Sequence, residues 1–433
     1  MKNKFLFFQD RDFSFEEEYK KSRRKIFLFQ SISFALIFFY SFQNGRVNNS
    51  FDIELFFLAL GLVASSFLTN TFFRKFIHGD PYLLMIAQAL FSIGVIVVYR
   101  IDPDAGIKQL KFYFLSLLAF FFVYFLLKKT YAFWENRSFL FYYVLSALLL
   151  LMTLAFGFAY GGAKNWIEIG SYSVQPSEFA KIPFIFFVAA WYKKYESFQQ
   201  KKWMKYSLMF LSYFLILLFF LQRELGTAIV FYSVLTASQV AYEQNKRLII
   251  YNILLAFLGL LMAYFLFSHI RVRFAIWRNP WEDPMNTGYQ IIQSLIAIAE
   301  GGFFGKGLGL GSPNLIPLGH SDFIFASIIE EMGLFMGICL IFLYILLIYR
   351  GSKVAISQER DFYSVLALCI SFLFASQAFI MFAGVMKVIP LTGITIPFLT
   401  YGGSSLLSSF ILLACLQVST EDFMLLESNH EKI

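Results

Sequence analysis

Charged residues are scarce in this sequence, and their scarcity excludes an ordinary soluble protein. They make up 15% of the 433 residues, against about 25% in soluble domains. Hydrophobic residues make up 58%, and 58 residues are phenylalanine. The apolar runs are continuous and do not alternate, which argues against a transmembrane β-barrel. We therefore predict an all-α, polytopic membrane protein.

Cysteine is also rare, and this excludes a disulfide framework. The three cysteines, Cys339, Cys369 and Cys415, all lie inside apolar runs, and their spacing is not that of a metal site. The net charge of +8 comes largely from short basic segments between apolar runs, so we expect no nucleic-acid partner.

Twelve apolar runs come near the ~20 residues that a helix needs to cross a bilayer. They cover residues 26–43, 53–70, 81–99, 110–127, 138–160, 178–192, 205–221, 225–242, 247–268, 323–349, 362–385 and 397–418. The run at 178–192 is short and contains Pro183. Basic segments such as "KKSRRK" and "KKWMK" fall in alternate connections, so the positive-inside rule predicts that both termini are cytoplasmic.

Two segments outside these runs are expected on the external side of the membrane. The first is residues 161–177, and the second is the loop 269–322, which is longer than most loops in compact proteins. The second loop ends in "LGHSDF", where Asp322 precedes the run at 323–349. Asp322 or Ser321 would suit a helix N-cap, whereas a functional reading makes Asp322 a general base with His320 nearby.

Two further carboxylates are candidate functional residues. Glu178 and Lys181 in "QPSEFAK" share one helix face and can pair inside the membrane, either to lock helices together or to shape a functional cavity. Glu224 in "QRELGT" suits a cavity carboxylate or an ordinary turn, and the turn is favoured because Arg223 beside it can neutralise the charge.

Basic residues in the loop 269–322 run against the charge bias of the topology. They indicate either an anionic ligand such as a pyrophosphate or a solvated patch, and they are Arg271, Arg273, Arg278 and Lys306. The run "GKGLGLG" at 305–311 lacks the Walker pattern, so it predicts close backbone packing rather than nucleotide binding. The glycines and serines of "YGGSS" at 401–405 likewise favour close helix packing.

Four stretches together resemble one known family. They are "GAKNWIEIGSYSVQPSEFAKI", "GYQIIQSLIAIAEGGFFGKGLGLGS", "GHSDFIFASIIEEMGL" and "TGITIPFLTYGGSSLL". In order and spacing they look like the SEDS (shape, elongation, division and sporulation) proteins, the RodA/FtsW polymerases of bacterial peptidoglycan. The resemblance runs from about residue 80 to 418 and implies a core of ten transmembrane helices.

The resemblance also divides the chain. It implies a cytoplasmic tail at 1–25, an extra transmembrane hairpin within 26–75, the SEDS core at 76–418 with its external loop 269–322, and a cytoplasmic tail at 419–433. The extra hairpin adds two helices to the ten of the core and keeps the N-terminus in the cytoplasm.

As the resemblance implies, the protein polymerises lipid II into glycan strands on the outer face of the cytoplasmic membrane. Asp322 then matches the proposed catalytic aspartate, Glu178 and Lys181 match the buried ion pair, and Trp166 matches a family tryptophan, although Asn165 replaces the arginine before it. Glu224 stands where the family has aspartate, and Leu318 stands where it has glutamate.

The expected partners are lipid II, the undecaprenyl-linked growing glycan and a class B penicillin-binding protein. The pyrophosphate leaving group needs cations rather than a second acid, so basic loop residues or a divalent cation (Mg²⁺ or Mn²⁺) are expected to assist Asp322. A lipid-linked precursor flippase and a non-catalytic scaffold for a transpeptidase stay open as alternatives.

Overall fold

The computed structural model describes residues 22, 24–25, 27–28, 30–37, 53–77, 79–160, 163–170, 172–201 and 203–421. Most of the predicted tails at 1–25 and 419–433 and part of the run at 26–43 lie outside the described residues. The helices are α3 Ile53–Phe76, α4 Tyr82–Ile101, α5 Pro103–Lys129, α6 Tyr131–Asn136, α7 Phe139–Phe156, α8 Pro176–Tyr192, α9 Tyr195–Gln199, α10 Ser207–Gln222, α11 Leu225–Tyr242, α12 Lys246–Leu266, α13 Ser268–Arg278, α14 Tyr289–Gly301, α15 Ile324–Ser357, α16 Asp361–Val385 and α17 Gly403–Val418. Residues 30–37 are also helical.

Long apolar helices dominate the fold and confirm the polytopic membrane class. Within the described ranges, eight helices are long and apolar enough to cross a membrane: α4, α5, α7, the α10 segment, α11, α12, α15 and α16. Two shorter apolar helices cover Leu55–Thr69 and Gly403–Val418. The weak run at 178–192 is a helix as well. Helix α8 begins at Pro176, where a missing N–H costs nothing, and it continues through Pro183. The count of twelve spans stays a prediction.

A small antiparallel sheet replaces the loop that was expected after α7. Its strands are β1 Phe158–Tyr160, β2 Ala163–Ile169 and β3 Tyr172–Val174, in the order β1-β2-β3. Phe158 pairs with Trp166, and Ile167 pairs with Val174. Helix α7 therefore ends at Phe156, before the predicted boundary at 160, because the chain turns into β1.

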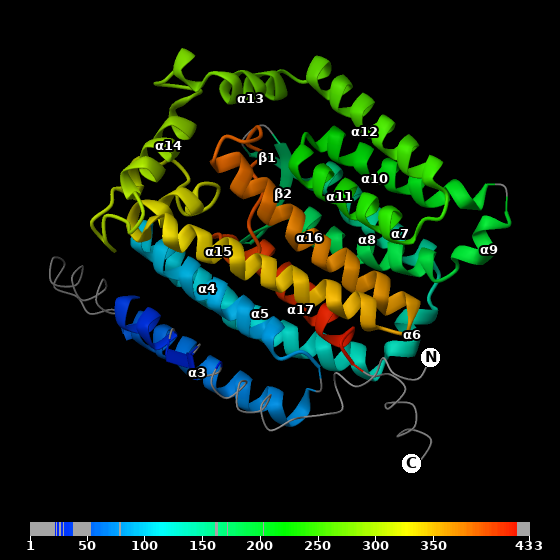
Figure 1. The fold of residues 1–433 in the computed structure, drawn as a ribbon, viewed down its shortest axis with the longest axis horizontal. Coiled ribbons are helices and arrows are strands. Elements are labelled where there is room, and N and C mark those ends of the chain that lie inside the picture. Colours follow the sequence, from blue (N-terminus) through cyan, green and yellow to red (C-terminus); the bar gives the residue numbers. More distant parts are fainter. Residues whose placement is uncertain are drawn as a thin grey trace.

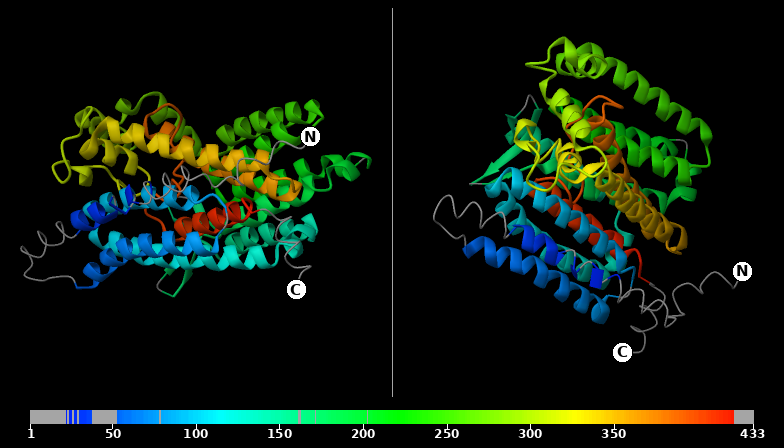
Figure 2. Two further views of the ribbon diagram at one scale, coloured as in Figure 1. Left: turned by 60° about the horizontal axis from the view of Figure 1, so that its bottom comes forward. Right: turned by 60° about the vertical axis from the view of Figure 1, so that its left-hand side comes forward.

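The helices lie side by side in a tilted bundle (Figure 1). Helix α17 packs against α5, α15 against α16, and α7 against α8. The sheet, α13 and α14 gather at one end of the bundle, while α6 and α9 lie at the opposite end. Helix α3 lies at the edge of the molecule beside α5, as the rotated views also show (Figure 2).

Helix α15 contains a sharp kink that glycines make possible. Gly333 has φ +83°, and the backbone N–H groups of Leu334 and Phe335 donate to the carbonyls of Gly302 and Phe303 at 2.9 and 3.1 Å. A Cβ on Gly305 would lie 2.2 Å from the carbonyl oxygen of Glu331. The glycine-rich run thus permits close backbone packing, as predicted, and residues 302–303 are tied to α15 at the kink.

Candidate functional site

Asp322 lies in the turn that leads into α15, but it does not cap that helix. The N-cap residue is Phe323, and no side chain makes a capping hydrogen bond there. The Ser321 hydroxyl instead contacts the carbonyl of Leu318, at 3.4 Å. The capping interpretation of Ser321 and Asp322 is therefore wrong, which leaves the Asp322 carboxylate free of a helix-starting role.

Arg273 of α13 lies close to the turn that carries Asp322. Its guanidinium donates to the carbonyl oxygens of Leu391 and Thr392, at 3.1 and 2.8 Å. The next residue, Gly393, has φ +71°, and a Cβ built on it would lie 3.5 Å from Asp322 Oδ2 and 3.8 Å from Arg273 Nη2. One carboxylate and one guanidinium thus meet at a glycine in the segment between α16 and α17.

The environment of Asp322 changes its acidity. Burial disfavours the charged carboxylate and raises the pKa of Asp322 to about 6, while the positive charge of Arg273 acts in the opposite direction. A carboxyl group with this pKa is mostly ionised at neutral pH. Its carboxylate is also a stronger base than the carboxylate of an ordinary aspartate. This is the balance that a general base needs.

His320 makes its contacts with Tyr401. Its backbone carbonyl accepts a hydrogen bond from the N–H of Tyr401 at 3.1 Å, and its ring meets the Tyr401 ring edge-on, with centroids 5.5 Å apart. Burial lowers the pKa of His320, so its neutral form is favoured. The structure therefore places His320 as a packing partner of Tyr401, and the acidic group that acts on its ring is Asp102 rather than Asp322.

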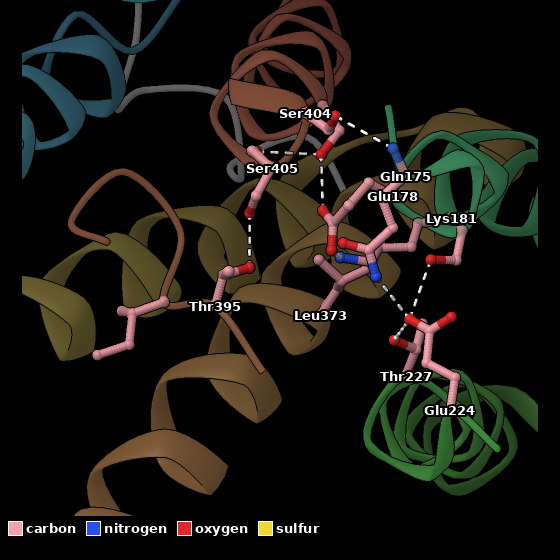
Figure 3. A network of polar contacts seen from close by, with 12 residues as sticks. Gln175, Glu178, Lys181, Glu224, Thr227, Leu373, Thr395, Ser404 and Ser405 are labelled. Atoms are coloured by element: carbon pink, nitrogen blue, oxygen red, sulfur yellow. Dashed lines mark hydrogen bonds and ion pairs between the residues drawn. The ribbon is translucent and has the colours of Figure 1, made fainter. Parts of the chain in front are cut away.

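A second polar cluster lies inside the helix bundle (Figure 3). Lys181 donates to Glu178 Oε1 at 2.6 Å, and the Ser408 hydroxyl of α17 donates to Glu178 Oε2 at 3.0 Å. Glu178 and Lys181 are 4% and 2% exposed. The predicted ion pair is confirmed, and each charge is compensated where water is largely excluded.

Glu224 belongs to this buried cluster. Its Oε1 atom accepts hydrogen bonds from Gln175 Nε2 at 2.8 Å, Ser177 Oγ at 3.0 Å and Thr227 Oγ1 at 2.5 Å. Its other oxygen, Oε2, is buried and has no hydrogen-bond partner among the described residues. Burial raises the pKa of Glu224 to about 7, with the hydroxyls of Thr227 and Ser177 opposing the shift.

These contacts overturn the favoured interpretation of Glu224 as a turn residue neutralised by Arg223. Arg223 adopts a left-handed conformation, with φ 60°, that ends α10. The side chains that bond to Glu224 come from the start of α8, where Gln175 is the N-cap residue, and from the first turn of α11, in agreement with the view in Figure 3. Adjacency in sequence suggested the wrong partner because the chain reverses direction at this point.

Sequence reasoning also missed most of the hydroxyl groups of the cluster. The N–H of Gln175 donates to Ser404 at 3.3 Å, and Ser405 bonds to Thr395 at 2.7 Å. Ser404 and Ser408, one turn apart in a helix, were a usable signal, because both then face the same way. The expected close packing is also present, since a Cβ on Gly403 would lie 2.6 Å from the ring of Phe112.

The remaining predicted site residues lie in separate places. Trp166 is half-buried in β2. Lys306 pairs with Glu300 and with Glu330, the latter at 3.4 Å. Arg271 donates to the carbonyl of Phe265 at 2.7 Å, and Arg278 is exposed at the end of α13. Of the four basic loop residues, the described contacts bring only Arg273 to Asp322.

A resident metal ion finds little support in the side chains present. Among the described residues, no group of three or more His, Cys, Asp or Glu is placed to hold a metal ion. At Asp322 the charged neighbour is a guanidinium, which itself suits a phosphate oxygen. A divalent cation, Mg²⁺ or Mn²⁺, stays a prediction.

Comparisons with known proteins agree with this architecture. The FtsW, RodA and SpoVE family model, described as cell cycle protein, matches residues 81–422. The peptidoglycan glycosyltransferase RodA of Mycobacterium tuberculosis is 34% identical over 369 residues, which cover 78% of this chain and 77% of that protein. Stage V sporulation protein E of Bacillus subtilis is 33% identical over 348 residues, covering 76% and 93%.

A solved structure shares the fold. It is described as "Structural coordination of polymerization and crosslinking by a peptidoglycan synthase complex" and superposes with a TM-score of 0.64 at 24% identity. The superposition covers 78% of this chain and 97% of that chain. The likeness confirms a polytopic helical fold of that kind.

Proposed function

Because the chain belongs to the FtsW, RodA and SpoVE family of cell cycle proteins, we propose that it is a peptidoglycan glycosyltransferase that polymerises lipid II. The family membership confirms the resemblance that the four sequence motifs indicated. The observation that best supports the activity is the meeting of Asp322 and Arg273 at Gly393. The process served is cell-wall synthesis during cell elongation or division.

The proposed reaction inverts the configuration at the anomeric carbon of the donor sugar. The donor is α-linked to a lipid pyrophosphate, and the product linkage is β-1,4. The 4-hydroxyl of the acceptor sugar attacks the anomeric carbon, the bond from that carbon to the pyrophosphate oxygen breaks, and the lipid pyrophosphate leaves with its electron pair. The hydroxyl proton passes to Asp322, which acts as general base.

Arg273 supplies the positive charge that the leaving group needs. Pyrophosphate is a good leaving group once cations stabilise its developing charge, so no second carboxylic acid is required. Two of the hydrogen bonds of Arg273 go to backbone carbonyls, which fix the orientation of the guanidinium beside the carboxylate. Arg271 and Arg278 lie on the same helix, but the helical period turns them roughly 140–160° away from Arg273, so this proposal gives the phosphate contact to Arg273.

The buried cluster of Glu178, Lys181 and Glu224 has a different role in this proposal. Lys181 is paired and almost fully buried, so in this proposal it stabilises the contact between α8 and α17 that Glu178 and Ser408 make. In the proposed topology both termini are cytoplasmic, and Asp322 and Arg273 face the outer side, where acceptor sugars arrive. Trp166 and His320 border this outer end, and Lys306 stabilises the neighbouring loop.

The proposal includes a partner. The structural relative is described as a complex that coordinates polymerization and crosslinking, and a glycan polymerase needs a crosslinking enzyme to consume its product. We propose a class B penicillin-binding protein in that role, with lipid II and the undecaprenyl-linked glycan as substrates.

The test is polymerisation of fluorescent lipid II by the purified protein, with and without its candidate partner. We expect glycan ladders from the wild type and a loss of about 10²–10⁴-fold in rate for Asp322→Asn, which is the usual contribution of a general base. Glu282→Gln is the matched control, because Glu282 is an exposed carboxylate in the same loop. Equal ladders from Asp322→Asn would remove Asp322 from the chemistry. Ladders from no sample would favour a flippase or a scaffold.

A further inference from the structure

The N-terminal helices lie outside the part of the chain that the family model matches. The match begins at residue 81, whereas α3 covers Ile53–Phe76 and residues 30–37 are also helical. The two segments pack together, since the rings of Phe34 and Phe56 lie 6.0 Å apart and those of Phe27 and Phe67 lie 6.5 Å apart. We call residues 27–28 and 30–37 and α3 together the N-terminal pair; the family match does not cover it.

Buried polar side chains connect the N-terminal pair to the core. Gln88 of α4 donates through Nε2 to Thr69 Oγ1 at 3.0 Å and to the Tyr113 hydroxyl at 3.3 Å. Ser65 of α3 bonds to the same Tyr113 hydroxyl at 3.2 Å. Gln88 and Tyr113 are fully buried, and Ser65 and Thr69 are nearly so. Two helices of the core and one of the pair thus share a single hydrogen-bonded cluster.

Such a cluster fixes both the partner and the register of a membrane helix. Apolar helices gain little from leaving lipid for one another, so packing and interhelical hydrogen bonds decide where they associate. Close packing is present as well, because a Cβ on Gly61 would lie 2.9 Å from the ring of Phe114. The N-terminal pair is therefore seated on the α4–α5 face by directional contacts.

The same face of α5 continues toward the buried cluster of the site. Gln109 lies four residues, about one helical turn, before Tyr113. Its amide donates to the carbonyl of Thr400 at 2.9 Å and accepts from the N–H of Gly402 at 3.2 Å. These residues lead directly into α17, where Ser404 accepts a hydrogen bond from the N–H of Gln175. Tyr113 also meets the ring of Phe410 in α17, with centroids 5.8 Å apart.

We propose that the N-terminal pair is a built-in partner of the α4–α5 face, seated through Gln88 and Tyr113, and that it positions the 400–402 turn through Gln109 of α5. Ser65 and Thr69 are thus positioning residues. They act on the site through α5 and do not touch substrate.

Hydrogen–deuterium exchange of the full-length protein tests the positioning. We expect the peptide covering 397–405 to exchange faster in the double variant Ser65→Ala/Thr69→Val, by about threefold for each lost hydrogen bond. Thr69→Ser keeps the hydroxyl and should retain wild-type exchange. Thr71→Val is the matched control, because the exposed Thr71 hydroxyl bonds only within its own helix, to Phe67. The readout uses resting protein, so it does not depend on the proposed polymerase activity.

A cross-linking measurement tests the seating separately. Cysteines at positions 61 and 114, in a background without the native cysteines, should be joined by a short bis-maleimide in membranes, and the double variant should slow this reaction. Gln88→Leu should have the same effect from the core side. Slower cross-linking without faster exchange at 397–405 would overturn the positioning role. No change in either measurement would overturn the whole proposal.

Discussion

Asp322 changes its charge within a pH range that is simple to assay. Its pKa is raised to about 6 by burial, so the carboxylate is the main form above this pH and the protonated acid below it. We expect the rate of lipid II polymerisation at low substrate concentration to fall about tenfold per pH unit below pH 6. A pH–rate profile measures this directly. A rate that stays constant down to pH 4.5 would contradict the role of Asp322 as base.

Arg273 sets the pH at which the rate begins to fall on the acid side of the pH–rate profile, which we call the acid limb. The guanidinium lowers the pKa of Asp322 against the effect of burial, so its removal must raise that pKa. In Arg273→Gln we expect the acid limb to move to higher pH, together with a lower maximal rate because the leaving group loses a cation. Arg247→Gln, an exposed residue at the start of α12, should keep the wild-type limb. A lower rate with an unmoved limb would mean that Arg273 serves the phosphate alone.

Glu224 links pH to stability. Burial raises its pKa in the folded protein to about 7 from an ordinary value of 4.5. A group with a raised folded pKa stabilises the fold below its unfolded pKa, and this stability is lost as pH rises through the folded value. Glu224→Gln should therefore raise the melting temperature at pH 8 and change it little at pH 5, as thermal unfolding in detergent would show. Equal shifts at both pH values would exclude titration of Glu224 as the cause.

Local pairs were predictable from sequence, and distant ones were not. Glu178 and Lys181 are three residues apart on one helix, so the helical period alone brings them together. Glu224 takes two of its three hydrogen bonds from residues 47 and 49 positions away. Helix packing decides which distant side chains contact a carboxylate. The periodicity of a sequence does not predict such contacts.

At the scale of an element, α15 shows both what a pattern conveys and what it hides. Its apolar run predicted a helix from 323 to 349, and α15 indeed begins at Ile324. The kink at Gly333 was not predicted, because a glycine within an apolar run also fits a straight helix. The sheet of β1, β2 and β3 was missed for a similar reason, since its short strands alternate too briefly to give a period.

The kink gives a prediction for α15. A side chain at Gly333 would need φ +83° and would place its Cβ 2.3 Å from the carbonyl oxygen of Phe303. Gly333→Ala should therefore lower the melting temperature markedly, because it combines backbone strain with a clash against backbone. Gly259→Ala in α12 is the matched control; there the nearest atom to an added Cβ is 4.0 Å away, and stability should stay equal or rise slightly. Similar melting temperatures for both variants would contradict the kink.

At the scale of the whole molecule, the two ends of the bundle differ in kind. One end carries the sheet, α13 and α14, and the other carries α6 and α9 (Figure 1). The positive-inside rule assigned the first end to the outer side. We expect a cysteine introduced at Asp283 to react with an impermeant maleimide in intact cells, and one introduced at Trp203 to react only after lysis. The reverse pattern would invert the topology and with it the proposed site of polymerisation.

The tie between residues 302–303 and 334–335 has a consequence for how this family can vary. The segment that ends at Asp322 leaves the bundle after residue 303 and re-enters it at Phe323, which is fully buried. The hydrogen bonds to residues 334–335 hold the start of this segment against α15, so much of the entropy of closing it is lost on folding, before substrate binds. Doubling the length of such a loop costs only about 0.6 kcal/mol of further closure entropy. Insertions between residue 303 and Asp322 should therefore cost little stability. Evolution can thus reshape the approach to the Asp322 carboxylate without repacking a transmembrane helix.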